Sequence, residues 1–139
     1  NGVLCGYLVD NMKVRIFDGS FHAVDSDAMA FELCAKHGFK EAAAKAGAIL
    51  MEPIMKIDIY TPDLYMGNIM SDLNRRRAAT EGIDEKNNLK VIKTKVPLSE
   101  LFGYVTDLRS MSSGRADGHL EFSHYLPVPK NLADKILTA

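Results

Sequence analysis

His22 is the residue with the clearest potential for chemistry, because it lies in a short loop after Gly19, Ser20 and Phe21. Residues 12–17 alternate apolar and charged side chains, which predicts a half-buried strand before the loop. Contact residues concentrate on loops that rigid elements hold in place. An imidazole beside an aromatic ring can stack on nucleic-acid bases or bind their backbone. The pattern alone leaves an ordinary surface loop as an equal alternative.

A second candidate is the run Arg75, Arg76 and Arg77 at the end of an expected helix. Guanidinium groups match the oxygens of a phosphate, so this run could contact RNA. The competing interpretation is a basic cluster that complements the helix dipole. Consecutive helical residues point about 100° apart, so the three side chains cannot share one face. Other basic residues that could extend such a patch are Lys90, Lys93, Lys95, Arg109 and Arg115.

The other histidines and the two cysteines form no recognisable catalytic or metal-binding pattern. His37 lies opposite the apolar side of its expected helix, while His119 and His124 are expected on opposite faces of one strand. The sequence contains no phosphate-binding loop, dinucleotide fingerprint, zinc motif or serine-hydrolase motif. We therefore expect no catalysis, no metal and no cofactor in this chain itself.

The composition is that of an ordinary globular protein. The chain has 139 residues, of which 47% are hydrophobic and 25% charged, with a formal net charge of −1. These values exclude a collagen or a disordered charged tail, and no apolar run is long enough to span a bilayer. The near-zero charge argues against a general nucleic-acid coat but allows a local basic patch. Two cysteines make no disulfide framework, so a cytoplasmic setting is expected.

The first 52 residues contain too few elements for a closed domain. Apolar residues at helical spacing predict a helix over residues 27–46, with Asp25 or Ser26 as its cap and Gly47 at its end. One strand and one amphipathic helix must pack against something outside them. We therefore expect a truncated unit whose apolar face is exposed or self-associates.

Residues 53–126 predict the order β-α-β-β-α-β, followed by a short helix over 130–138. The four strands are expected at residues 55–60, 79–85, 91–96 and 120–125. The first helix starts at 61–63, and Ser99 is expected to cap the second. Pro53 is expected to end pairing at a hinge. Side chains expected in the core include Phe102, Tyr104, Val105 and Phe122. The pattern predicts an α+β class with a ferredoxin-like sandwich.

Several long motifs, in order and in register, resemble bacterial translation elongation factor G. The motifs lie at residues 18–25, 50–56, 72–77, 96–104, 106–110, 114–115 and 121–125. By this resemblance, residues 1–52 are similar to the second half of domain IV, an incomplete unit like the second domain of ribosomal protein S5. Residues 53–139 are similar to domain V.

The resemblance implies a GTP-driven translocase of transfer RNA and messenger RNA. GTP and Mg would bind in a GTPase domain that lies upstream of these residues. Domain IV would reach the decoding centre of the ribosome, and domain V would lie near the GTPase-associated region. No membrane partner is expected.

The resemblance also implies roles for single residues. The tip of domain IV, which supports translocation, would comprise Gly19, Ser20, Phe21 and His22. Candidate contacts with ribosomal RNA are Arg75, Arg76 and Arg109. Asp72 and Glu100 could instead pair with these arginines and give them a structural role.

Two alternatives remain open at this stage. The first is a paralogue for ribosome recycling or tetracycline protection, since Phe21 replaces the commoner tyrosine and residues 84–88 and 116–118 depart from the pattern. The second is a free-standing ferredoxin-like regulatory module that binds a small molecule. That module would require a complete first domain and a defined pocket.

Overall fold

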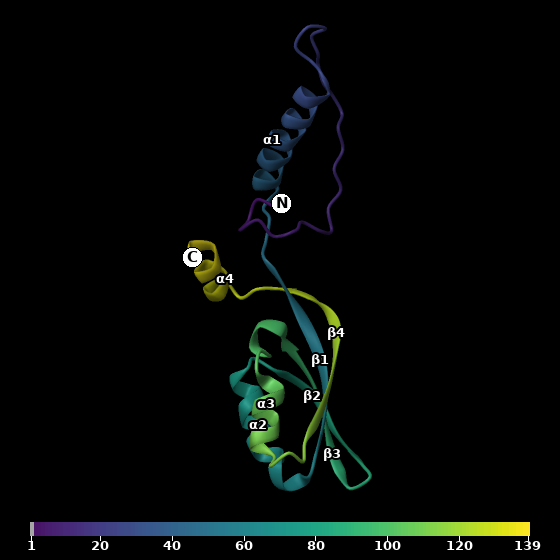
Figure 1. Cartoon of the computed structure of the whole chain (residues 1–139), viewed down its shortest axis with the longest axis vertical. Helices are drawn as coiled ribbons and strands as arrows, with labels where there is room; N and C mark the ends of the chain where they lie inside the picture. The colour runs from purple at the N-terminus through teal and green to yellow at the C-terminus, as the bar shows by residue number, and fades with distance from the viewer. Residues whose placement is uncertain (1) are drawn as a thin grey trace. The chain divides into compact units, whose positions relative to one another are not determined.

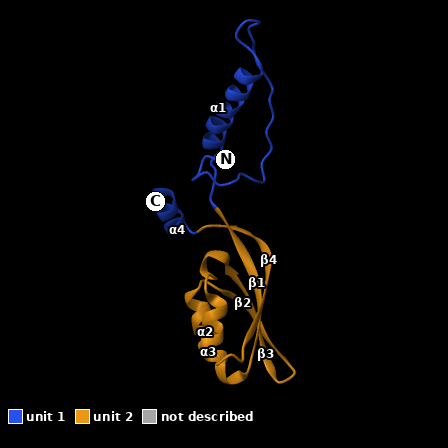
Figure 2. Ribbon diagram, in the orientation of Figure 1, with its two compact units in different colours: residues 1–50, 129–139 blue, residues 51–128 orange. Residues whose placement is uncertain are grey.

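The structure is a computed structural model that describes residues 2–139, so position 1 of the first predicted unit lies outside the described residues. The chain divides into two compact units (Figure 2). Unit 1 comprises Asn1–Leu50 and Pro129–Ala139, and unit 2 comprises Met51–Val128. The two units are described separately below.

Unit 2 has the predicted ferredoxin-like topology, which confirms the fold class (Figure 1). Its elements are β1 (Met51–Thr61), α2 (Asp63–Arg75), β2 (Ala79–Lys86), β3 (Leu89–Pro97), the 3-10 turn η1 (Leu98–Glu100), α3 (Tyr104–Met111) and β4 (Asp117–Pro127). The sheet order is β2-β3-β1-β4, and every neighbouring pair is antiparallel. Asn87 and Asn88 both have positive φ and form the tight turn between β2 and β3.

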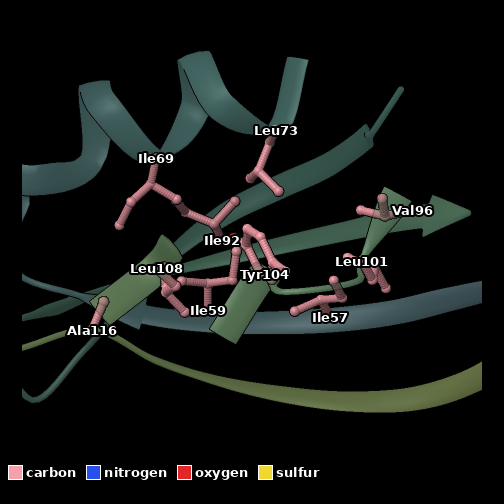
Figure 3. Packing of buried hydrophobic residues seen from close by; sticks show 10 residues of the cluster. All are labelled: Ile57, Ile59, Ile69, Leu73, Ile92, Val96, Leu101, Tyr104, Leu108 and Ala116. Atoms are coloured by element: carbon pink, nitrogen blue, oxygen red, sulfur yellow. The ribbon is translucent and has the colours of Figure 1, made fainter. Parts of the chain in front are cut away.

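A single apolar core lies between the sheet and helices α2 and α3 (Figure 3). Its buried members are Ile57, Ile59, Ile69, Leu73, Ile92, Val96, Leu101, Tyr104, Leu108 and Ala116. The predicted inward stripe of α2 is confirmed, since Ile69 and Leu73 are fully buried. Burying each large apolar side chain contributes roughly 1.5–3 kcal/mol, so this core stabilises unit 2.

The start of β1 differs from the prediction. Pro53 does not end pairing, because β1 begins at Met51 and Pro53 lies opposite Tyr125 of β4. The first pair between β1 and β3 is Ile54 with Pro97. At Pro53, therefore, β1 has a neighbour on one side only, and a proline without an N–H group is tolerated there.

The second helix also starts later than predicted. Ser99 lies in η1 and does not cap α3, whose N-cap is Gly103 with a φ of 75°. Glycine permits this left-handed turn without strain. Phe102 is 80% exposed in the turn, and Val105 is half-exposed on α3, so both core assignments were wrong.

Strand β4 differs from the prediction in two further ways, and a β-bulge explains one of them. His124 lies opposite Ile54 but Phe122 lies opposite Met55, which leaves one extra residue on β4 between them. Phe122 precedes the extra residue and stays in phase with Leu120, yet its side chain is exposed, contrary to the prediction. His119 lies opposite Asp58, so His119 and His124 share a face, contrary to the prediction. They are still about 13 Å apart along the strand, too far to share a metal ion.

Unit 1 contains α1 (Ala28–Ala46) and α4 (Lys130–Thr138), which confirms both predicted helices. Gly47 ends α1 with a φ of 80°, but Asp27 is the N-cap in place of Asp25 or Ser26. Residues 12–17 form no strand, and no described segment pairs with them in a ladder. No residue of α1 is buried, so its apolar face is exposed.

We expect the phenol of Tyr104 to make unit 2 sensitive to alkali. Its hydroxyl is buried without a hydrogen-bond partner among the described residues, and burial raises its pKa. The neutral form is thus favoured by folding, and stability should fall by up to about 1.4 kcal/mol per pH unit above about pH 10. Tyr104→Phe should remove this loss and change stability at pH 7 by less than about 1 kcal/mol.

Urea unfolding between pH 7 and pH 11, followed by circular dichroism, measures the effect. Tyr125→Phe is the matched control, because Tyr125 is 56% exposed. An equal loss of unfolding free energy at alkaline pH in both variants would contradict the assignment to Tyr104.

Candidate functional site

The loop Gly19–His22 is an exposed part of unit 1 that leads into α1. Phe21 is 72% exposed, a high value for an aromatic ring. The N–H of Gly19 donates to Asp18 Oδ1 at 2.8 Å, which fixes the entry to the loop. The loop therefore presents an aromatic ring and an imidazole next to each other in the sequence.

The main chain of His22 is held on both sides. Its N–H donates to Ser26 Oγ at 2.8 Å. Its carbonyl oxygen accepts from the N–H groups of Asp25, at 3.2 Å, and Ser26, at 3.0 Å. Its imidazole makes no hydrogen bond to any residue that the structure describes, so both ring nitrogens are available to a partner.

This closed turn is attached directly to α1. Asp27 Oδ1 accepts from the N–H of Ala30 at 2.8 Å and caps the helix one residue after Ser26. Helix α1 has 19 residues and is therefore about 28 Å long. His22 is thus at the N-terminal end of α1, and the chain leaves from the other end at Gly47.

Ser26 supports the loop in a way that the sequence did not reveal. The sequence offers it, with Asp25, as a helix cap, whereas its hydroxyl accepts from the main chain of His22. Serine near a helix start suits both roles, so its residue type cannot separate them. The four-residue spacing from His22 is the one signal that could have indicated the bond.

The guanidinium of Arg76 binds other residues of unit 2. Its guanidinium donates to Asp72 Oδ2 at 2.8 Å and to the carbonyl oxygen of Glu100 at 2.6 Å, and it also pairs with Asp107. It lies 4.9 Å from the centre of the Tyr104 ring, a cation–π contact. Burial opposes its charge, but the bonds to the two aspartates outweigh burial and raise the pKa of Arg76.

Its two neighbours are also paired. Arg75 donates to Asp72 Oδ1 at 2.6 Å, although its side chain is 78% exposed. Arg77 forms two bonds to Glu52, at 2.9 and 3.1 Å, and one to Glu100 at 3.2 Å. Asp72 thus holds Arg75 and Arg76, which is the structural role that the sequence left open, whereas Arg77 is held by Glu52, which the sequence did not indicate, and by Glu100. Of the three arginines, Arg75 alone keeps a largely accessible guanidinium.

Arg109 and Arg115 are exposed and make no ion pair within residues 2–139. They flank the turn that ends α3, where Gly114 N donates to Arg109 O at 2.8 Å and Arg115 N donates to Ser112 O at 3.0 Å. The buried hydroxyl of Ser112 donates to Leu108 O at 2.7 Å. A rigid turn therefore carries two free guanidinium groups.

The lysines of β3 are neutralised by acids on β2. Lys95 pairs with Glu81, Lys93 with Asp84 and Lys90 with Glu85, at 2.8, 2.6 and 2.8 Å. The bond from Lys95 lowers the pKa of Glu81, and that from Lys90 lowers the pKa of Glu85. These lysines therefore do not form the patch of unpaired basic side chains that the sequence suggested as an extension of the arginine run. Across the described chain, no group of three metal-binding side chains and no helix able to cross a membrane occurs.

Comparison with known proteins identifies both parts of the sequence. The family described as "Elongation factor G, domain IV" matches residues 1–47, and "Elongation factor G C-terminus" matches residues 49–136. Elongation factor G of Cytophaga hutchinsonii is 60% identical over 137 residues, which is 99% of this chain and 20% of that protein. The Amoebophilus asiaticus elongation factor G is 56% identical over 99% of this chain and 19% of that protein.

A crystal structure of a protein from Thermus thermophilus has the same fold, with a TM-score of 0.78 at 37% identity. The match covers 87% of this chain and 18% of that one. The chain thus spans about a fifth of the length of the curated relatives that it matches.

The hydrogen bond from His22 to Ser26 should hold the loop in place. Ser26→Ala removes the acceptor, and amide exchange at His22 should quicken by several-fold because one hydrogen bond contributes about 1 kcal/mol. Helix α1 should keep its helicity, since Asp27 still caps it. Ser20→Ala is the control. Unchanged exchange at His22 in Ser26→Ala would refute the role of Ser26.

Proposed function

The chain belongs to the elongation factor G family, and on that premise we propose that it forms the ribosome-contacting part of a translocase. The loop Gly19–His22 would be the tip that enters the decoding centre behind the transfer RNA and messenger RNA. Unit 2 would contact ribosomal RNA near the GTPase-associated region. The protein would act in the cytoplasm.

The observation that carries this proposal is the state of His22. Its main chain is fixed by three hydrogen bonds, while its imidazole is exposed and unpaired in the described chain. A side chain on a rigid support can bind a partner without first losing backbone freedom, which lowers the entropy cost of contact. The exposed Phe21 beside it supplies a ring that can stack on an unpaired base.

The energy for translocation would come from GTP, bound with Mg in a domain outside this chain. The sequence has no phosphate-binding loop, so the part of this chain would be to bind and to position. The tip would act by occupying space and by contacting RNA.

Among the arginines proposed to contact ribosomal RNA, the geometry favours Arg109, with Arg115 as its neighbour. Both are free to form paired bonds to phosphate oxygens. The side chain of Arg76 is 16% exposed and forms ion pairs with two aspartates, so a contact with RNA would have to break these ion pairs. Arg75 could add a weaker contact, because Asp72 already neutralises part of its charge.

The curated relatives carry the name elongation factor G, which favours a translocase over the recycling and tetracycline-protection paralogues. The match of both units to one family also argues against a free-standing regulatory module. Self-association through the exposed face of α1 remains a proposal, which sedimentation can test.

The proposed tip leads to a specific kinetic result. In the full-length protein, His22→Ala should slow single-round translocation by roughly tenfold, equivalent to losing one contact of about 1.4 kcal/mol. GTP hydrolysis on the ribosome should be unchanged, because the variant leaves the nucleotide site intact.

The matched control is His37→Ala, which removes an exposed histidine from α1. If His22→Ala translocates at the unmodified rate, or if His37→Ala is equally slow, His22 is not a tip residue.

The proposed RNA contact should depend on salt. Changing Arg109 and Arg115 together to Gln should weaken ribosome binding and lower the slope of log affinity against log salt by about 1–2. Changing Lys90 and Lys93 to Gln removes the same charge from residues that are already paired. Binding assays from low to moderate salt should find a smaller change for the lysine pair, and equal changes would count against the α3 turn.

A further inference from the structure

The turn that leads into α3 displays one aromatic ring. Phe102 is 80% exposed, whereas Leu101 before it and Tyr104 after it are buried. Figure 3 shows Leu101 and Tyr104 among the core side chains of unit 2. A single apolar side chain on a surface is common and carries no information by itself. What distinguishes Phe102 is that its backbone is held firmly between two core residues.

Hydrogen bonds of the main chain fix this turn. The N–H of Leu101 donates to Leu98 O, and the N–H of Tyr104 donates to Leu101 O, both at 3.0 Å. Gly103 takes a left-handed conformation, with a φ of 75°, that lets the chain pass from η1 into α3. The ring is therefore attached to a backbone that loses little freedom when it binds a partner, which lowers the entropy cost of binding.

Two arginines hold the residue at the start of the turn. Arg76 donates to the carbonyl oxygen of Glu100 at 2.6 Å, and Arg77 donates to its carboxylate at 3.2 Å. Glu52 of β1 in turn accepts two bonds from Arg77, at 2.9 and 3.1 Å. A guanidinium–carboxylate pair with two bonds fixes both distance and orientation. Side chains of β1 and of the end of α2 thus support the segment that carries Phe102.

Two further apolar side chains of the same segment are exposed, namely Leu98 and Val105. We call Leu98, Phe102 and Val105 the apolar knob. An aromatic side chain that fills a pocket of a partner carries a large share of the binding energy in many protein–protein interfaces. A rigid knob with a central aromatic ring has the form of such an anchor.

The charged side chains bound to this segment do not favour RNA. Their ion pairs join three arginines to four carboxylates, which leaves one net negative charge: Arg75, Arg76 and Arg77 with Glu52, Asp72, Glu100 and Asp107. Binding to RNA depends on cations that neutralise phosphates. The knob is therefore better suited to an apolar pocket in a protein than to a nucleic acid.

The other end of α3 has the opposite character. Arg109 lies in the last turn of the helix and Arg115 follows it, and neither has an ion-pair partner within the described residues. Helix α3 has eight residues and is therefore about 12 Å long. An apolar start and a basic end are thus separated by about the length of the helix.

We propose that the apolar knob docks into an apolar pocket of a protein component of the ribosome, with Phe102 as its anchor, while the basic end of α3 contacts RNA. This inference rests on the proposed function, because it takes the ribosome as the partner, and it adds a contact with protein to the contact with RNA at Arg109. Helix α3 thereby binds where protein and RNA lie next to each other, and a surface of RNA alone satisfies only its basic end.

Equilibrium binding of the full-length protein to purified ribosomes tests the anchor. Phe102→Ala should weaken the affinity about tenfold or more, as the loss of an interface anchor typically does. The slope of log affinity against log salt should stay the same, because no charge is lost. Leu64→Ala is the matched control, since Leu64 is 79% exposed on α2, and its affinity should equal that of the unmodified protein. An unchanged affinity in Phe102→Ala overturns the proposal.

A second measurement tests the chemistry of the partner. With p-benzoylphenylalanine in place of Phe102, irradiation of the full-length protein bound to purified ribosomes should attach it to a ribosomal protein. The same group in place of Leu64 is the control and should give a much lower yield. Attachment of position 102 to RNA alone, or to nothing, shows that no protein pocket receives the ring and overturns the docking, as do equal yields at the two positions.

Two further results separate this inference from its alternatives. The urea midpoint of full-length Phe102→Ala should be unchanged, and a lower midpoint overturns the docking because it shows that the ring packs within its own chain. If changing Arg109 and Arg115 to Gln weakens ribosome binding and Phe102→Ala does not, the docking fails and the proposed RNA contact stands. The converse result removes the RNA contact and leaves the docking standing.

Discussion

The architecture of unit 2 depends on one buried carboxylate. Asp72 is 5% exposed at the end of α2, and its two oxygens accept from Arg75 and Arg76. Through Arg76 the same group reaches Glu100 and Asp107, so the C-terminal end of α2 is joined to the start of α3. A charge buried at this depth needs its partner, because removing one member of such a pair typically costs about 3–5 kcal/mol.

The need to neutralise Asp72 also decides which basic residues remain for RNA. A run of three arginines looks like a phosphate site in the sequence, but internal acids occupy most of its hydrogen-bonding capacity. The lysines on β3 are matched in the same way by acids on β2. Among the arginines of unit 2, Arg109 and Arg115 at the α3 turn have no ion-pair partner within the described residues. Local pairing, and not the number of basic residues, therefore defines the candidate interface.

The sequence predicted unit 2 well because its strands alternate and its helices carry regular apolar stripes, as Ile69 and Leu73 illustrate. It failed at the shared face of His119 and His124 and at Ser99. The causes are a bulge in β4 and a 3-10 turn before α3, and no local pattern in the sequence indicates either. It failed at residues 12–17 because alternation predicts a strand only where a neighbour is present to pair with it. The roles of Ser26 and Arg77 depend on contacts that three-dimensional folding creates.

The sheet order has a consequence for synthesis. Strand β1 lies between β3 and β4, and β4 (residues 117–127) is the last strand of the sheet in the sequence. While the chain is being made, β1, α2, β2 and β3 emerge first, and one edge of β1 stays open until β4 follows. An open strand edge with apolar neighbours is prone to pair with other chains. The nascent protein therefore passes through a stage in which its central strand is a target for chaperones or for aggregation, and β4, the last strand of this sheet to be synthesised, closes it.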